Sequence, residues 1–511
     1  MRGAMATLMS FGPFELDPAV PMLRRDGRVL KAGRRALDLL AALVEARGAV
    51  VSKPALMDRA WPGLFVDEAN LTVQMSALRR LLGRRDDGGD WIVTVPGLGY
   101  RFAPGTAGGG GRDERPGLAV LPFDHAEGDA DIGYFADGVV TDLIAALYRF
   151  RGILVIARNV AFACRGQAAD SRALAAALGV GYVLEGSLRR DGDRLRVVTA
   201  LVDGRNGGQI WCGRFDGSLG DVFAVQDRIV ESVAAHVAPQ MLDSEIARSR
   251  RERPASVAVY DLALRALADL KDESEPANRR AFALLERALV LEPDNAALLC
   301  HAAWALEHRH AMGWTPLGED DVGLCLRLTR RSLQHGRGDA RLMAQCAMNL
   351  MQAGRDYASA IAIAKAAVAA NANDPLTRVV AGLVAAHCGD LDEAEAHLSH
   401  VLAMAPLDPD TRFALCGLAM IAIIRGDDHL ALARAGHALA VNPHFDATYW
   451  MLIAANAYLG QMAEARRHVA ALRRLVPGVT VARIRRGQPA MIPARLERLL
   501  DGLRRGGLPD T

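Results

Sequence analysis

The sequence has no apolar run long enough to cross a lipid bilayer. Its longest run, around residues 414–424, is far shorter than the roughly 18 residues that a membrane-spanning helix needs. The N-terminus also lacks the charged segment followed by an apolar segment that marks a secretory signal. We therefore expect a soluble, cytoplasmic protein that does not contact a membrane.

The sequence also lacks paired cysteines and the common motifs of nucleotide-binding enzymes. Its seven cysteines are scattered singly, without a C-x-x-C pair, which predicts free thiols in a reducing compartment rather than disulfides or a zinc site. It contains no G-x-x-x-x-G-K-[S/T] phosphate loop and no G-x-G-x-x-G after a strand. No catalytic constellation stands out, so we expect no enzyme activity, no cofactor and no metal.

A strong net charge is missing as well. The formal charge of +2 on 511 residues is too small to indicate nucleic-acid binding by the whole chain, so any basic surface must be local. Apolar residues make up 51% and charged residues 23% of the chain, which is typical of globular domains. A chain of this length predicts about three domains.

The texture of the sequence changes three times. Residues 1–104 mix short strand-like runs with amphipathic helices, and residues 117–245 alternate strand and helix patterns. Between them, residues 105–116 are rich in glycine, which predicts a flexible linker. From residue 255 to 478 the pattern is helical and alanine-rich. The expected fold is therefore α+β, then mixed α/β, then all-α, with a tail at 479–511.

The all-α region contains an internal repeat. Alanine is followed twelve residues later by proline at Ala281–Pro293, Ala394–Pro406, Ala431–Pro443 and Ala465–Pro477. Glycine stands five residues before three of these alanines. Looser copies around Cys325 and Ala360 lie between Ala281 and Ala394, so successive copies are about 34 to 37 residues apart, with one longer interval that accommodates an insertion near 308–320. This pattern resembles tetratricopeptide repeats, in which small residues let two helices approach and proline ends the second. We expect five or six repeats over 255–478.

The C-terminal tail carries apolar residues at helical spacing between Ile484 and Leu508, together with many arginines. A repeat array needs a terminal element to cover its open apolar face. The favoured interpretation is therefore a capping helix, and the alternative is a basic interaction tail.

The N-terminal region predicts three helices and a hairpin. The helices cover 37–48, 52–61 and 67–82, with Ser52 as the N-cap of the second. The hairpin covers 91–102. Asn70-Leu71, Ala77-Leu-Arg-Arg-Leu-Leu82 and Thr94-Val-x-Gly-x-Gly-Tyr-Arg-Phe102 resemble the winged helix-turn-helix domain of OmpR/PhoB-type transcription regulators, in the variant that also heads CadC-like and ToxR-like regulators. The resemblance implies that the third helix enters the major groove of double-stranded DNA and that the hairpin forms the wing.

Polar residues on the third helix and the wing are the candidate DNA contacts. Those able to hydrogen-bond to base edges are Asn70, Gln74 and Arg79. Those suited to phosphates are Thr72, Ser76, Arg80, Thr94, Tyr100 and Arg101. Pro96 stands where many members carry an arginine, which leaves open whether Arg101 or Arg34 and Arg35 supply that charge. The alternative for the whole set is a merely solvated helix face.

The middle region predicts a mixed sheet. Strands are expected near 118–123, 152–157, 181–188, 194–202 and 209–215, with helices at 134–148, 171–178 and 221–237. The runs Ala119-Val-Leu-Pro-Phe123 and Gly179-Val-Gly-Tyr-Val-Leu-Glu-Gly-Ser187 resemble the TolB N-terminal-like or FlgO-like domain, which implies no defined chemistry. Asp137 and Glu185, each followed by glycine, suit either a ligand site or, preferably, a helix cap and a tight strand end.

One cluster in the repeats resembles a metal site. His301, Glu307, His308 and His310 lie close in sequence, but histidines at such spacing on a helix are more often surface residues than ligands. We therefore expect surface positions.

Two functions remain. In the first, the protein is a one-component transcription regulator whose repeats sense an effector or recruit a protein partner, such as RNA polymerase or a peptide on the concave repeat surface. In the second, the repeats are a scaffold and DNA binding is only an anchor. A homodimer is compatible with either function.

Overall fold

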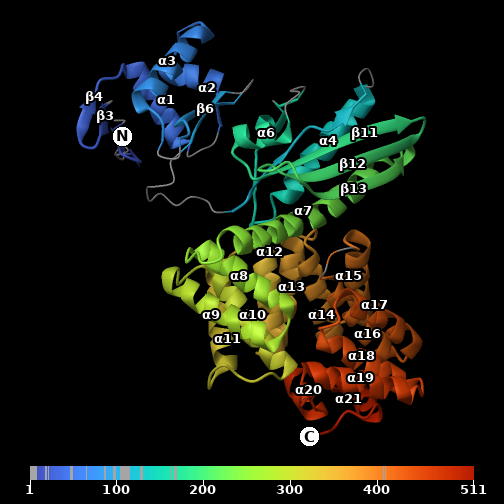
Figure 1. Cartoon of the computed structure of the whole chain (residues 1–511). Helices are drawn as coiled ribbons and strands as arrows, with labels where there is room; N and C mark the ends of the chain where they lie inside the picture. The colour runs from blue at the N-terminus through green and yellow to red at the C-terminus, as the bar shows by residue number, and fades with distance from the viewer. Residues whose placement is uncertain are drawn as a thin grey trace. The chain divides into compact units, whose positions relative to one another are not determined.

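The computed structural model describes residues 9–17, 20, 22–46, 50–64, 66–85, 88–95, 99–103, 115–126, 130–162, 164–165, 170–406, 408 and 410–511. The chain divides into two compact units (Figure 1). The first contains Met1–Ile144 and Gly152–Val222, and the second contains Ala145–Arg151 and Phe223–Thr511. The linker expected at 105–116 lies outside the described residues except for its last two positions.

The first unit begins with an α+β domain. Its helices are α1 (Arg34–Glu45), α2 (Lys53–Ala60) and α3 (Glu68–Leu82). Its strands are β1 (Met9–Phe11), β2 (Phe14–Asp17), β3 (Met22–Arg25), β4 (Arg28–Leu30), β5 (Val50–Ser52), β6 (Ile92–Val95) and β7 (Gly99–Phe102). Strands β1 to β4 form an antiparallel sheet in chain order, while β6 and β7 form a hairpin that β5 extends. The expected leading strands, three helices and hairpin are confirmed.

Aromatic side chains hold the two sheets of this domain together. Phe11 and Phe14 from the first sheet contact Trp91 and Phe102 from the hairpin region, with ring centroids 4.9 to 5.6 Å apart. All four residues are buried. The hairpin is therefore fixed at its base by the domain core, while its tip lies outside the described residues.

The rest of the first unit is a mixed sheet with helices. Its strands are β8 (Gly117–Val120), β9 (Asp124–His125), β10 (Leu154–Val155), β11 (Tyr182–Asp191), β12 (Arg194–Asp203) and β13 (Gln209–Ser218), and its helices are α4 (Ala130–Leu147), α5 (Arg158–Phe162) and α6 (Ser171–Leu178). The order is β10-β8-β11-β12-β13, parallel from β10 to β11 and antiparallel from β11 to β13. Figure 1 shows the three long strands side by side. The predicted mixed sheet is confirmed.

The two carboxylates singled out in this sheet domain have partners within it. Asp137 forms an ion pair with Arg165, and Glu185 accepts a hydrogen bond from the Ser171 hydroxyl at 2.5 Å. Asp137 does not cap a helix, as the sequence favoured, because α4 already begins at Ala130. Both carboxylates therefore support the fold.

Helix α7 (Val222–Glu252) is much longer than the helix expected at 221–237. The sequence placed its end before Pro239 because proline lacks an N–H donor and its ring crowds the preceding turn. In the structure the helix continues through Pro239. Contacts with the repeats offset that cost, including a hydrogen bond of 3.2 Å from the Ser232 hydroxyl to the Met404 carbonyl. The domain boundary expected at 245 consequently falls inside a helix.

The second unit is built from paired helices. These are α8 (Val259–Asp272), α9 (Glu275–Leu291), α10 (Ala296–Met312), α11 (Asp321–His335), α12 (Ala340–Gln352), α13 (Tyr357–Ala370), α14 (Pro375–Cys388), α15 (Leu391–Met404), α16 (Thr411–Arg425), α17 (Asp428–Val441), α18 (Asp446–Tyr458) and α19 (Met462–Leu475). Over the described residues they form six consecutive helix hairpins, α8 with α9 through α18 with α19. The array of paired helices resembles tetratricopeptide repeats, as predicted. Its six helix pairs correspond to the larger of the two expected numbers of repeats.

The repeated alanines explain how closely the paired helices approach. Ala281, Ala394, Ala431 and Ala465 are each 0% exposed. Since a methyl side chain occupies little volume, a helix can lie directly against its partner at these positions. The first helices of successive pairs, α10, α12, α14, α16 and α18, also contact one another, so these inner helices are buried on several sides.

The tail folds into two helices, α20 (Val481–Gly487) and α21 (Pro493–Arg505), rather than the single helix expected. Two prolines, Pro489 and Pro493, interrupt the helical pattern between them. Helix α21 packs on α18 and α16, and α20 packs on α10. The tail therefore does cap the array, but it covers inner helices of several repeats and not only the last.

The histidine cluster in α10 is buried, contrary to the surface location that the sequence favoured. His301 lies within the fold, and Glu307 and His308 are 3% and 9% exposed. The reason is that α10 is an inner helix, in contact with α12 and α20 as well as its own partner. Burial raises the pKa of Glu307 to about 8 and lowers the pKa values of His301 and His308 to about 4. Within the described ranges, no group of three or more such residues is arranged to hold a metal ion.

Replacing Glu307 with glutamine should change how stability depends on pH. The carboxyl has a pKa near 4.5 when unfolded and about 8 when folded, so between these values only the unfolded chain releases its proton. The contribution of the protonated Glu307 carboxyl to stability is therefore complete below a pH near 4.5, and it is lost as the pH rises toward 8. Relative to the wild type, the free energy of unfolding of Glu307→Gln should rise by on the order of 1 kcal/mol per pH unit across this window. Urea unfolding of the full chain measures it.

The matched control is Glu286→Gln on the exposed face of α9, which should give a difference independent of pH. Parallel stability curves for Glu307→Gln and the wild type would contradict the raised pKa of Glu307.

Candidate nucleic-acid interface

Helix α3 buries one face and exposes the other. It begins at the N-cap Asp67, whose carboxylate accepts a hydrogen bond from the backbone N–H of Ala69 at 2.8 Å. The predicted apolar stripe is confirmed: Leu71, Met75, Leu78 and Leu82 are at most 1% exposed. Since successive residues are turned by about 100° around a helix, the face opposite this stripe is centred on Val73 and Arg80.

Four of the predicted contact residues lie exposed on this helix. They are Asn70, Thr72, Ser76 and Arg80. Val73, which is 63% exposed, is not among the predicted contacts, because all of those are polar side chains. A valine in this position suits the methyl group of thymine, which is part of the pattern that the major groove presents. The angular position of Val73 relative to the apolar stripe would have identified it.

Arg79 connects α3 to the hairpin instead of facing solvent. Its Nε donates to the carbonyl of Ile92 at 2.8 Å, and one of its terminal nitrogens donates to the hydroxyl of Thr94 at 2.6 Å. The guanidinium carbon also lies 5.7 Å from the ring centroid of Tyr100. With these donors engaged, Arg79 positions the wing relative to the recognition helix, and the base-reading role predicted for it is not the one that the geometry favours. Gln74 is also partly buried.

The hairpin residues differ in how they are presented. Thr94 is exposed, but Tyr100 is 4% exposed and belongs to the domain core. The phosphate contact predicted for Tyr100 is therefore corrected, because its ring packs inward. Pro96 lies outside the described residues.

Arg101 forms hydrogen bonds within the first unit. Its guanidinium donates to the carbonyls of Ala177 at 3.3 Å and Ala176 at 3.2 Å, near the C-terminal end of α6. A cation at this end of a helix interacts favourably with the helix dipole. In this arrangement Arg101 contacts protein carbonyls in place of the predicted phosphate, whereas Arg34 and Arg35 at the start of α1 are exposed.

An ion pair joins the two helices that precede the hairpin. Lys53 at the start of α2 pairs with Glu68 in the first turn of α3, and this hydrogen bond raises the pKa of Lys53. The negative charge of Glu68 also suits the N-terminal end of the helix dipole. The pair fixes the start of α3 relative to α2.

Two family models match the first unit. The model for "Transcriptional regulatory protein, C terminal" matches residues 27–102. The model for "HilA/YgeH-like transcriptional regulator, second domain" matches residues 114–232. The first match contains α3 and the hairpin, and the second contains the mixed sheet.

Curated relatives are similar over parts of the chain. A putative adenylate cyclase 3 of Rhizobium meliloti is 37% identical over 192 residues, which are 38% of this chain and 32% of that protein. The transcriptional activator CadC of Escherichia coli is 33% identical over 92 residues, 18% of each chain. The transcriptional regulator HilA of Salmonella typhimurium is 37% identical over 87 residues, 16% of each chain. The chain thus spans a third or less of the length of these relatives.

Solved structures are also similar to parts of the chain. The DNA-binding domain of Escherichia coli CadC is 29% identical, with a TM-score of 0.18, and the match covers 20% of this chain and 95% of that one. TolB from Acinetobacter baumannii is 17% identical, with a TM-score of 0.19, over 25% of this chain and 29% of that one.

The geometry predicts different effects for two adjacent arginines. Arg80→Ala should weaken binding to duplex DNA and reduce the slope of log Kd against log salt concentration by about 1, because one phosphate contact is lost. Arg79→Ala should instead lower the thermal unfolding midpoint of the first unit, because two hydrogen bonds to the wing are lost. Fluorescence anisotropy at several salt concentrations and calorimetric unfolding of the full chain test these effects.

Arg59→Ala is the control, since Arg59 is an exposed residue of α2 that pairs with Glu45 at 3.0 Å. It should leave the salt slope unchanged. An Arg80→Ala variant with the slope of the wild type would show that Arg80 does not contact phosphate.

The family matches and the observed architecture agree on how the chain is organised. The winged helix carries the CadC and HilA similarity, and the following sheet is the segment that the HilA second-domain model matches. The chain therefore carries an OmpR/PhoB-type winged-helix DNA-binding domain like those of CadC and HilA, followed by a HilA-type second domain and a helical region that resembles tetratricopeptide repeats.

Proposed function

We propose that this chain is a sequence-specific, one-component transcription regulator that acts on double-stranded DNA in the cytoplasm. The observation that carries the proposal is the exposed face of α3 around Val73 and Arg80, within a domain matched by a transcription-regulator model. A helix of this kind fits the major groove, where hydrogen-bonding groups and the thymine methyl distinguish the base pairs.

In this proposal the residues of the interface divide into three roles. Asn70 and Val73 read base edges in the major groove. Thr72, Ser76 and Arg80 contact phosphates and so fix the position of the helix. Arg79 holds the wing at the correct angle to α3 through its bonds to Ile92 and Thr94.

The repeats are proposed to supply the signal. They form the largest part of the second unit. Sensing by this region, with a change in DNA binding or in contact with RNA polymerase, is the one-component arrangement. The inner helices are covered by α21, which argues against an extended peptide on that face.

No catalytic step, cofactor or metal is part of the proposal. The similarity to the adenylate cyclase covers 32% of that protein, so its named activity is not carried over. No helix among those that the structure describes is long and apolar enough to span a membrane.

The test is a map of the DNA sites that the full chain occupies in its host, combined with transcript levels. The wild type should occupy discrete sites that share a sequence motif. Val73→Glu should lose this occupancy, because it places a carboxylate against the duplex. The matched control is Val29→Glu, since Val29 on β4 is 59% exposed and Val73 is 63% exposed.

Occupancy without a shared motif, or unchanged occupancy with Val73→Glu, would refute DNA reading by α3. If sites are lost but transcript levels stay the same, the scaffold function, with DNA binding as an anchor, replaces the regulator function.

A further inference from the structure

The second unit contains a pocket where the tail meets the inner helices. Residues from α10, α12, α14, α16 and α18 form one side, and residues from α21 and from the turn between α20 and α21 form the other. The cavity has a volume of about 100 Å³. An engineered cavity of about 150 Å³ in another protein binds benzene, so this smaller space limits an occupant to at most about one ring.

Most of the pocket wall is apolar. Its aromatic residues are Phe413, Phe445 and Trp450, and Met420 and Met451 add flexible thioethers. Helix α21 contributes aliphatic side chains, including Leu496 and Leu499. Since ligand sites are typically apolar clefts with a few polar groups that fix orientation, the polar groups in this wall carry the information about the occupant.

Those polar groups are uncharged. Burial, with the positive charges of Arg355 and Arg495, lowers the pKa of His387 to about 4, so its imidazole is neutral at physiological pH. Burial raises the pKa of Cys416 to about 12, which keeps its sulfur as a thiol. Gln352 and Gln488 add neutral amides to the lining.

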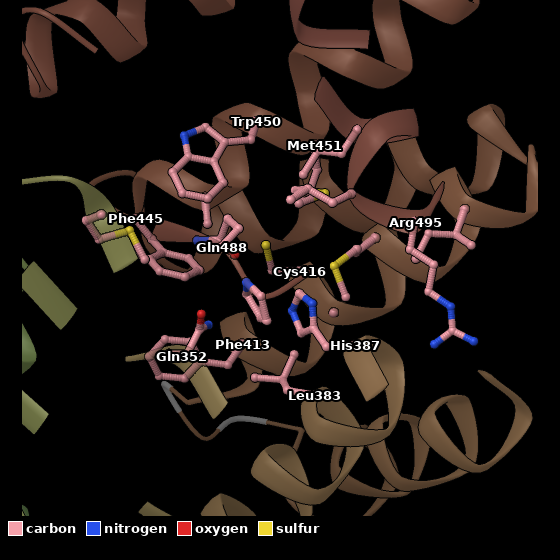
Figure 2. Close-up of a pocket in the computed structure, with 18 of the residues that line it drawn as sticks. Gln352, Leu383, His387, Phe413, Cys416, Phe445, Trp450, Met451, Gln488 and Arg495 are labelled. Carbon is pink, nitrogen blue, oxygen red and sulfur yellow. The ribbon is translucent and has the colours of Figure 1, made fainter. Parts of the chain in front are cut away.

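Among the described residues of the lining, Arg495 is the cation, and it hydrogen-bonds to backbone carbonyls. The guanidinium of Arg495 donates to the carbonyls of Ala386 at 2.7 Å and Gly389 at 2.9 Å. Figure 2 shows it turned away from the other labelled side chains. Arg495 therefore caps the C-terminal end of α14 and does not present its charge to an occupant.

Gln352 carries a polar atom for which the described residues offer no partner. Its amide oxygen is buried, and none of the described residues hydrogen-bonds to it; the same holds for the indole N–H of Trp450 in the same lining. Leaving a buried amide oxygen unpaired is unfavourable, whereas the amide of Gln488 in the same lining donates to the carbonyl of Ala311 at 3.1 Å. In the view of Figure 2 the Gln352 amide lies beside the Phe413 ring, with the His387 imidazole across the space from it.

We propose that this pocket binds a small, uncharged molecule with one apolar ring or branched chain and one hydroxyl or carboxamide group, which can donate to the amide oxygen of Gln352. The apolar part lies against Phe413, Phe445 and Trp450. The polar group hydrogen-bonds to Gln352 and His387. This inference deepens the proposed sensing role and rests on it for its purpose, but binding is independent of DNA.

The experiment compares three probes of similar size on the full chain: phenol, toluene and benzoate. Isothermal titration calorimetry, supported by saturation-transfer NMR, measures each affinity in the absence of DNA. Phenol should bind about tenfold more tightly than toluene, which corresponds to one net hydrogen bond. Benzoate should bind more weakly than phenol, because a carboxylate loses its hydration in a pocket without a free cation.

Two kinds of variant separate the polar from the apolar part of the site. Gln352→Leu with His387→Phe should reduce the affinity for phenol to that for toluene and leave toluene unchanged. Ala447→Leu, which adds volume to the lining, should weaken both. The controls are the same changes at exposed positions, Gln461→Leu and His437→Phe, which should alter neither affinity.

The outcomes are distinct. Absence of binding by all three probes, or equal loss with the control variants, overturns the site, and tighter binding of benzoate overturns the uncharged head group. If Ala447→Leu does not fold, the polar double variant still decides. Because no DNA is present, a negative result leaves the DNA-reading function of α3 intact, and loss of DNA binding with Val73→Glu leaves this pocket intact.

Discussion

Covering the inner helices of the repeats is the constraint on which the second unit depends. Helix α18 is buried along almost its whole length, from Asp446 to Ala457, and α16 is similar. A helix that is apolar on all sides cannot face water, so the array needs further chain to cover it. Helix α21 provides this with Leu496, Leu499, Leu500 and Leu503, all of which are buried.

The arginines of α21 also satisfy backbone carbonyls at the ends of two inner helices. The last carbonyls of a helix have no intrahelical partner, and α14 and α16 both end against the tail. Arg495 donates to carbonyls at the end of α14, and Arg498 donates to the carbonyl of Ile423 near the end of α16. The same helix thus supplies apolar cover and positive charge at two helix C-termini, which explains why the tail is rich in both leucine and arginine.

Local sequence patterns predicted most of the architecture. The repeated alanines, the stripe on α3, the cap at Ser52 and the hairpin turns each depend on contacts within one or two elements, so their spacing is visible in the sequence. Ser52, for example, accepts the predicted hydrogen bond from Ala55 at 3.3 Å.

What the sequence did not reveal depends on contacts between distant segments. The helix through Pro239 is held by repeats more than a hundred residues away. Glu307 and His308 belong to a polar run near the end of α10. Because other helices pack on α10, these polar residues are buried. On α3, Asn70 and Arg80 are exposed, as expected. Arg79 has the same chemical character as Arg80, but its side chain is hydrogen-bonded to the hairpin. Only the position of the hairpin shows that Arg79 is occupied.

The docking of the tail on the inner helices also links ligand binding in the pocket to the stability of the array. A ligand enclosed between α16, α18 and α21 gains its full contact only when α21 is docked on the inner helices, so its binding free energy favours the docked state by RT ln(1 + [L]/Kd). At a ligand concentration of about 100 times Kd this is roughly 2.7 kcal/mol. That is enough to change the population of an undocked tail about a hundredfold. An element that both completes the core and closes a pocket is therefore a suitable place for a signal to act, because the same contacts set the stability of the array and the affinity for the ligand.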